Sequence, residues 1–229
     1  MIAWYDNVPL LSFALLGARC RHCRAAIHWR YPLVETLTGV ATAVVVARFG
    51  AWPLGAVYLV FVWLLIAISF IDLEHRIIPL GMSVGGLIFA LVASALCPQM
   101  HGTSIPLLGL SRAVLGAFVG TGLLYLTGSI GSLCFRKEAM GLGDVDLMAM
   151  AGAFLGWKAV VLTFFMAPLL AVAPGLFVLV KKKSHEIPYG PFLSIALIAA
   201  LFAGQRIIDL TGIEHTVGMI KEYYLSGLR

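Results

Sequence analysis

The stretch WPLGAVYLVFVWLLIAISFI, residues 52–71, contains twenty consecutive residues and no charged side chain. The hydrocarbon core of a bilayer is about 30 Å thick, and an α-helix of about twenty apolar residues crosses it. The stretch is therefore long enough to form a transmembrane helix. Asp72 follows it directly, so we expect a carboxylate at the edge of the membrane.

The rest of the chain has the same character. It is 61% hydrophobic and only 12% charged, whereas soluble domains carry about 25% charged residues. Three further uncharged runs are as long: residues 77–97, 113–135 and 159–180. Three weaker candidates are residues 32–50, which contain Glu35 and Arg48, and the shorter uncharged runs 147–157 and 191–204. We therefore predict an all-α polytopic membrane bundle with about seven transmembrane helices, within a range of six to eight.

The predicted organisation has three parts. Residues 1–31 form a cytoplasmic segment with one Cys-x-x-Cys motif, residues 32–204 form the transmembrane domain, and residues 205–229 form an amphipathic tail. Glycines recur within residues 113–135, and small residues let membrane helices approach closely. These glycines are Gly116, Gly120, Gly122 and Gly128.

Basic residues predict the orientation. With seven spans, ten of the sixteen Lys and Arg residues lie in loops on the side of the N-terminus. Cytoplasmic loops are the ones enriched in Lys and Arg, so that side is predicted to be cytoplasmic, and it holds both Asp72 and Asp144. The net charge of +5 fits anionic lipid headgroups. Aromatic and basic residues do not alternate as in single-strand binders, so nucleic acid is not an expected partner.

Asp72 and Asp144 are the carboxylates that need an explanation, because charge at membrane depth is costly. Singly, Asp72 fits an interfacial charge, and Asp144 fits a helix N-cap. Together, two carboxylates on one face can share a proton, so that one activates water while the other polarises a carbonyl. Gly141 and Gly143 precede Asp144 and leave room for a substrate backbone to approach.

Three motifs in this order resemble the signatures of bacterial type IV prepilin peptidases, which are GxGD-type aspartic membrane proteases. They are Ile71-Asp-Leu-Glu-His-Arg-Ile-Ile-Pro79, Glu138-Ala-Met-Gly-Leu-Gly-Asp144 and Ile187-Pro-Tyr-Gly-Pro-Phe-Leu193. The resemblance implies that Asp72 and Asp144 are catalytic. It implies cleavage of prepilin or pseudopilin leaders after a glycine, at the cytoplasmic face of the bacterial inner membrane. The resemblance also implies that the peptidase activity needs no cofactor, and that the new N-terminus can be methylated with S-adenosylmethionine, as many members of the family do.

The N-terminal part departs from that family. Members usually have a membrane helix and another Cys-x-x-Cys ahead of this region. This sequence shows neither, and we interpret its start as truncated. Cys20 and Cys23 supply half of a tetrahedral zinc site, so two reduced cytosolic thiols are favoured over zinc. Methylation in the family involves this N-terminal region. The resemblance therefore supports methylation by this chain less strongly than it supports cleavage.

Three smaller points stay open. The family commonly has Asp or Asn where this chain has Leu80, and Lys where it has Asp146. The segment Ile187-Pro-Tyr-Gly-Pro191 fits either a loop beside the active site or a turn that starts a helix. Two alternatives to an active peptidase are an inactive truncated relative and a small membrane carrier or scaffold whose aspartates bind a cation or a proton.

Overall fold

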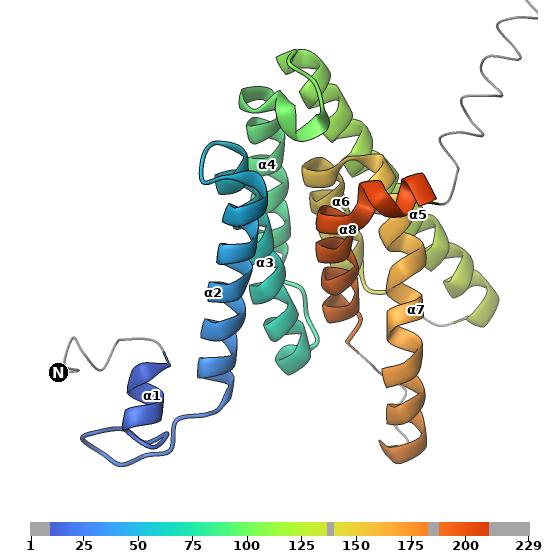
Figure 1. The fold of residues 1–229 in the computed structure, drawn as a ribbon. Coiled ribbons are helices and arrows are strands. Elements are labelled where there is room, and N and C mark those ends of the chain that lie inside the picture. Colours follow the sequence, from blue (N-terminus) through green and yellow to red (C-terminus); the bar gives the residue numbers. More distant parts are fainter. Residues whose placement is uncertain (1–9, 137–139, 183–187, 211–229) are drawn as a thin grey trace, which may run out of the picture. The chain divides into compact units, whose positions relative to one another are not determined.

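The computed structural model describes residues 10–136, 140–182 and 188–210. Within these ranges the chain is helical, as predicted (Figure 1). The elements are α1 (Leu11–Leu15), α2 (Arg30–Phe49), α3 (Leu54–His75), α4 (Leu80–Leu96), the 3₁₀ helix η2 (Pro98–His101), α5 (Pro106–Phe135), α6 (Leu142–Leu155), α7 (Trp157–Lys182) and α8 (Gly190–Leu210). Most of the predicted amphipathic tail, residues 211–229, lies outside the described residues.

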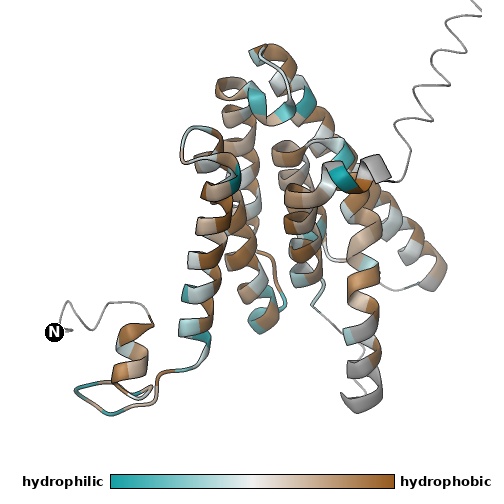
Figure 2. Ribbon diagram, in the orientation of Figure 1, coloured by the Kyte–Doolittle hydropathy of each residue, from teal (hydrophilic) through white to brown (hydrophobic). Residues whose placement is uncertain are grey.

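Four helices, α2, α3, α5 and α7, are long and apolar enough to cross a membrane, and α4 and α8 are shorter apolar helices. Figure 2 shows hydrophilic residues at the C-terminal end of α3 and in the turn between α4 and α5, with apolar residues along the helices between them. An all-helical architecture with several helices long and apolar enough to span a membrane is therefore confirmed for the described residues, while the count of seven spans stays a prediction.

The chain forms two compact units that divide between Ile66 and Ala67, inside α3. In the first unit, the backbone N–H of Leu10 donates to Glu35 Oε2 at 3.1 Å. The Trp63 indole N–H donates to Thr42 Oγ1 at 3.0 Å and links α3 to α2. The predicted three-part organisation, with residues 1–31, 32–204 and 205–229, stays a prediction.

The second unit is built around α6, which packs against α4, α5, α7 and α8. Most of α6 from Val145 to Phe154 is buried. Its closest neighbour is α5, because a Cβ on Gly116 would overlap the carbonyl oxygen of Gly152, and a Cβ on Gly120 would overlap that of Met148. Glycines thus let the two backbones touch, as small residues do between membrane helices.

Two predicted helix starts differ from the structure. α5 begins at Pro106, seven residues before the predicted run at 113, because Pro suits the first turn of a helix. Arg112 is tolerated there because it is exposed and its guanidinium donates to the His101 carbonyl at 2.6 Å. α4 begins only at Leu80, because the residue before Pro79 is pushed out of the helical region.

Candidate active site

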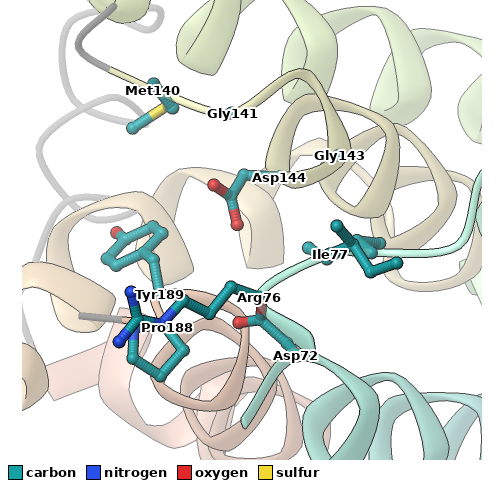
Figure 3. A pocket seen from close by; sticks show the side chains of 10 residues that line it. Asp72, Arg76, Ile77, Met140, Gly141, Gly143, Asp144, Pro188 and Tyr189 are labelled. Atoms are coloured by element: carbon teal, nitrogen blue, oxygen red, sulfur yellow. The ribbon is translucent and has the colours of Figure 1, made fainter. Parts of the chain in front are cut away.

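One cavity of about 590 Å³ lies where the C-terminal end of α3 meets the N-terminal ends of α6 and α8. Both sequence-predicted aspartates line it, and both carboxylates point into it (Figure 3). The lining residues are Asp72, Arg76, Ile77, Ile78, Met140, Gly141, Gly143, Asp144, Pro188 and Tyr189. The cavity therefore combines two carboxylates and one guanidinium with apolar walls.

Asp72 lies in the last turn of α3, which continues past residue 71, where the uncharged run of the predicted helix ends. The helix continues to His75 and ends where Arg76 takes the left-handed conformation with φ 55°. The Arg76 N–H then donates to the Asp72 carbonyl at 2.8 Å, as in other helix C-caps. The Asp72 side chain is only 5% exposed, and its Oδ2 accepts a hydrogen bond from the Gly190 N–H at 2.9 Å.

Asp144 is the third residue of α6, and Gly141 holds the N-cap position that the sequence offered as one interpretation of Asp144. Its carboxyl lies ahead of the apolar stretch that begins at Leu147. Burial raises the pKa of Asp144 to about 6, and the negative charge of Asp72 adds to the rise. At neutral pH this carboxyl therefore binds a proton far more readily than an ordinary aspartate.

The two glycines of the turn have different surroundings. A Cβ on Gly143 would lie 2.8 Å from Ile78 Cβ, so Ile78 packs on that side of Gly143, while Gly143 also lines the cavity and a substrate backbone at this residue stays a prediction. Gly143 lets the linker between α3 and α4 approach α6. Gly141 is exposed on the cavity, and a Cβ there would lie 3.4 Å from Asp144 Oδ2. A substrate backbone at Gly141 stays a prediction.

The Pro-Tyr-Gly-Pro segment both lies beside the candidate active site and starts a helix, so the two interpretations are compatible. Pro188 and Tyr189 line the cavity, and Gly190 begins α8. Burial raises the pKa of Tyr189 to about 12, with a contribution from the negative charge of Asp144, so the hydroxyl stays protonated at neutral pH. Arg76, Met140 and Tyr189 lie in the three motifs quoted above, but the motifs alone do not show which of their side chains, other than the aspartates, line the cavity.

Asp146 is half-buried on α6 and is not one of the residues that line the cavity. Residues two apart on a helix do not face each other, which agrees with this placement. Leu80 is exposed at the start of α4.

Cys20 and Cys23 belong to the unit that ends at Ile66, and neither forms a disulfide. They lie in a tight turn in which the Cys20 N–H donates to the Ala25 carbonyl at 2.9 Å. Across residues 10–136, 140–182 and 188–210, no three or more His, Cys, Asp or Glu side chains are grouped to hold a metal ion. Two thiols alone do not complete a tetrahedral zinc site.

Sequence comparisons decide the family. Residues 59–176, which include Asp72 and Asp144, match the model of the type IV leader peptidase family, and residues 1–49 match the bacterial peptidase A24 N-terminal domain. The chain belongs to the type IV leader peptidase family. The match covers about half of the chain and contains α4 to α6 in full.

Curated relatives within this family cover more of the chain. A prepilin leader peptidase/N-methyltransferase of Aeromonas salmonicida (strain A449) is 37% identical over 211 residues, which are 88% of this chain and 68% of the relative. One from Myxococcus xanthus (strain DK1622) is 41% identical over 180 residues, 78% of this chain and 51% of the relative. No solved structure gives a significant match.

Proposed function

We propose that this leader peptidase is a membrane-embedded aspartic endopeptidase that cleaves the leaders of type IV prepilins or pseudopilins, after a glycine. The observation that carries the proposal is the shared cavity of Asp72 and Asp144, which come from different helices, one buried and one with a raised pKa. The relatives' name, prepilin leader peptidase, supports the substrate class. Within the part of the chain that the structure describes, no group of three or more His, Cys, Asp or Glu side chains supports the alternative of a cation carrier.

The reaction follows from a pair that shares one proton. The ionised carboxylate takes a proton from water as the oxygen of that water bonds to the scissile carbonyl carbon, and the protonated carboxyl gives its proton to the carbonyl oxygen. In the breakdown step, the first carboxyl protonates the leaving amine while the C–N bond breaks. The second carboxylate recovers a proton from the hydroxyl group of the intermediate. Atoms and charges balance, and the pair returns to its starting state.

The proposed placement is in the bacterial inner membrane with about seven spans and the cavity on the cytoplasmic side. The excess of Lys and Arg on that side supports the orientation. An apolar prepilin stem would lie in the bilayer, and its leader would emerge at the membrane edge where the cavity lies. The scissile segment must unwind first, because helical peptide groups are already hydrogen-bonded and shielded.

Methylation is named for the relatives, and in them it would transfer a methyl group to the amine that cleavage creates. S-adenosylmethionine supplies an electrophilic methyl group for such chemistry. For this chain, methylation rests on the relatives' name alone, so we derive no step through the cofactor, and cleavage is the function that the geometry supports.

The direct test is leader removal. Membranes that contain the chain are mixed with a prepilin carrying its leader, and the product is identified by its gel shift and by its new N-terminal residue. Cleavage after a glycine supports the proposal. An intact prepilin, under conditions where a relative from Aeromonas salmonicida cleaves it, contradicts the proposal and favours an inactive relative.

Cleavage is expected to fall as pH rises through about 6. The raised pKa of Asp144 makes it the proton-holding partner, and it loses that proton above its pKa of about 6. Above that point the rate should fall about tenfold for each pH unit, and the midpoint belongs to the pair as a whole. The measurement is kcat/KM between about pH 5 and about pH 8.5 in detergent, and a flat profile across this range contradicts the assignment.

Asp146→Lys is expected to leave cleavage intact or to improve it up to severalfold. Asp146 does not line the cavity. A Lys at this position, one residue beyond the first turn of α6, would make the electrostatic potential at the aspartate pair less negative. The rate is measured at a fixed amount of folded protein, with thermal unfolding as the control for folding. A folded variant that has lost cleavage would show that Asp146 itself takes part.

A further inference from the structure

Gly190 joins the third motif directly to the aspartate pair. It is the first residue of α8, and the first N–H groups of a helix have no partner inside the helix. One of these donors is used by Asp72, since the Gly190 N–H lies 2.9 Å from Asp72 Oδ2. The positive end of the helix dipole points the same way and favours a negative charge at this position.

The position has no room for a side chain. A Cβ on Gly190 would lie 2.7 Å from Asp72 Oδ2, 3.2 Å from its Cγ and 3.4 Å from its Cβ. Any other residue would have to push the carboxylate away from its place in the cavity. Gly204, in the same helix, is different because a Cβ there would lie 3.8 Å from Ala200 Cβ and from Leu162 Cδ2, an ordinary contact.

The contact makes the two aspartates unequal. Burial disfavours the charged form of Asp72 as well, since this residue is only 5% exposed. The backbone donor of Gly190 opposes that effect and favours an ionised carboxylate. Asp144 lies where burial and the charge of Asp72 raise its pKa to about 6. The remaining charged or titratable groups in the cavity lining are Arg76 and Tyr189, and the Tyr189 hydroxyl stays protonated at neutral pH.

We propose that Gly190 is a positioning residue that holds Asp72 as the ionised, water-activating partner and so leaves Asp144 as the protonated partner. The inference rests on the proposed peptidase function and adds the division of labour within the pair. It also gives the third motif a role: its backbone, at the only residue type that fits, sets the charge of an aspartate more than one hundred positions earlier in the chain.

The first experiment compares Gly190→Ala with Gly204→Ala in the leader-removal assay. Gly190→Ala is expected to lower kcat about 100-fold with little change in KM, because a catalytic group displaced by about 1 Å loses that much. Gly204→Ala is expected to keep the original rate. Equal rates for the two variants, with the unsubstituted chain active, overturn the inference, whereas an inactive unsubstituted chain overturns the proposed function instead.

The second variant removes the hydrogen-bond donor at position 190 without adding a side chain. Glycolic acid incorporated at position 190 replaces the N–H by an ester oxygen and leaves the space unchanged. The acidic limb of the pH–rate profile is expected to move up by about one pH unit, and kcat to fall about tenfold, because a hydrogen bond to a charged group is lost. If Gly190→Ala does not bind prepilin, this variant decides: an unchanged acidic limb and rate overturn the inference.

Discussion

Asp72→Asn and Asp144→Asn are each expected to lower the rate of leader cleavage about 1,000-fold or more. Asn cannot take up or give the proton that the Asp carboxyl exchanges during cleavage. General acid or base catalysis alone contributes about 100- to 10,000-fold to the rate. Among the described residues that line the cavity, Asp72 and Asp144 are the only carboxylates, so no third carboxylate is present to take over from either. The measurement is the initial rate of leader removal at equal amounts of folded protein.

Asp146→Asn is the matched control, since it makes the same chemical change two residues along the same helix and outside the cavity lining. It is expected to keep the original rate. Cleavage by Asp72→Asn or Asp144→Asn at a rate near that of the control would remove the residue concerned from the catalytic pair.

The loss of activity in Asp144→Asn is not expected to come from unfolding. A folded-state pKa raised from 3.8 to about 6 means that Asp144 stabilises the fold most when it is protonated, and that this contribution is lost as pH rises through about 6. Asn stays neutral at every pH. Near pH 7.5 the variant should therefore be at least as stable as the parent, by up to about 3 kcal/mol.

The helices could be predicted because uncharged runs of membrane-spanning length leave few other structures. Their ends were less accessible. α3 continues past Asp72 since nothing in Leu73 to His75 stops a helix, and its end depends on the left-handed conformation of Arg76. Asp72 consequently lies on a helix, where its direction is fixed, rather than in a loop.

The site shows what sequence can and cannot reveal. Asp72 and Asp144 could be singled out because each interrupts an apolar region and both fall on one predicted side. The approach of Gly190 to Asp72 could not, since it joins residues far apart in sequence and depends on how α8 packs. For the same reason the sequence could not show that Ile78 fills the space beside Gly143.

The glycines of α5 are a second example of contacts that the sequence alone does not determine. The sequence indicated close packing but could not say which glycines make it. The structure separates them: Gly116 and Gly120 contact the backbone of α6, whereas a Cβ on Gly122 would meet nothing within 4 Å. The helix rotation that decides this is set by the neighbouring helices, and no residue of α5 alone encodes it.

Gly116→Ala is therefore expected to cost about 3 kcal/mol of stability, since the added methyl group would overlap the Gly152 carbonyl and force two buried backbones apart. Gly122→Ala adds the same atoms to the same helix in open space, and is expected to be neutral or to stabilise the helix by up to about 1 kcal/mol. The measurement is thermal unfolding in detergent, where Gly116→Ala should unfold about 10 °C lower. Equal unfolding temperatures would show that α5 and α6 are not packed this closely.

Gly120→Ala separates packing from catalysis. Its methyl group would overlap the Met148 carbonyl, one helical turn from Asp144, whereas the Gly116 contact lies a further turn away. Both variants should destabilise the fold, but Gly120→Ala should also lower the cleavage rate per folded molecule, because it displaces the turn that carries Asp144. If the two variants lower that rate equally, the rate does not depend on how closely the first turns of α6 are held.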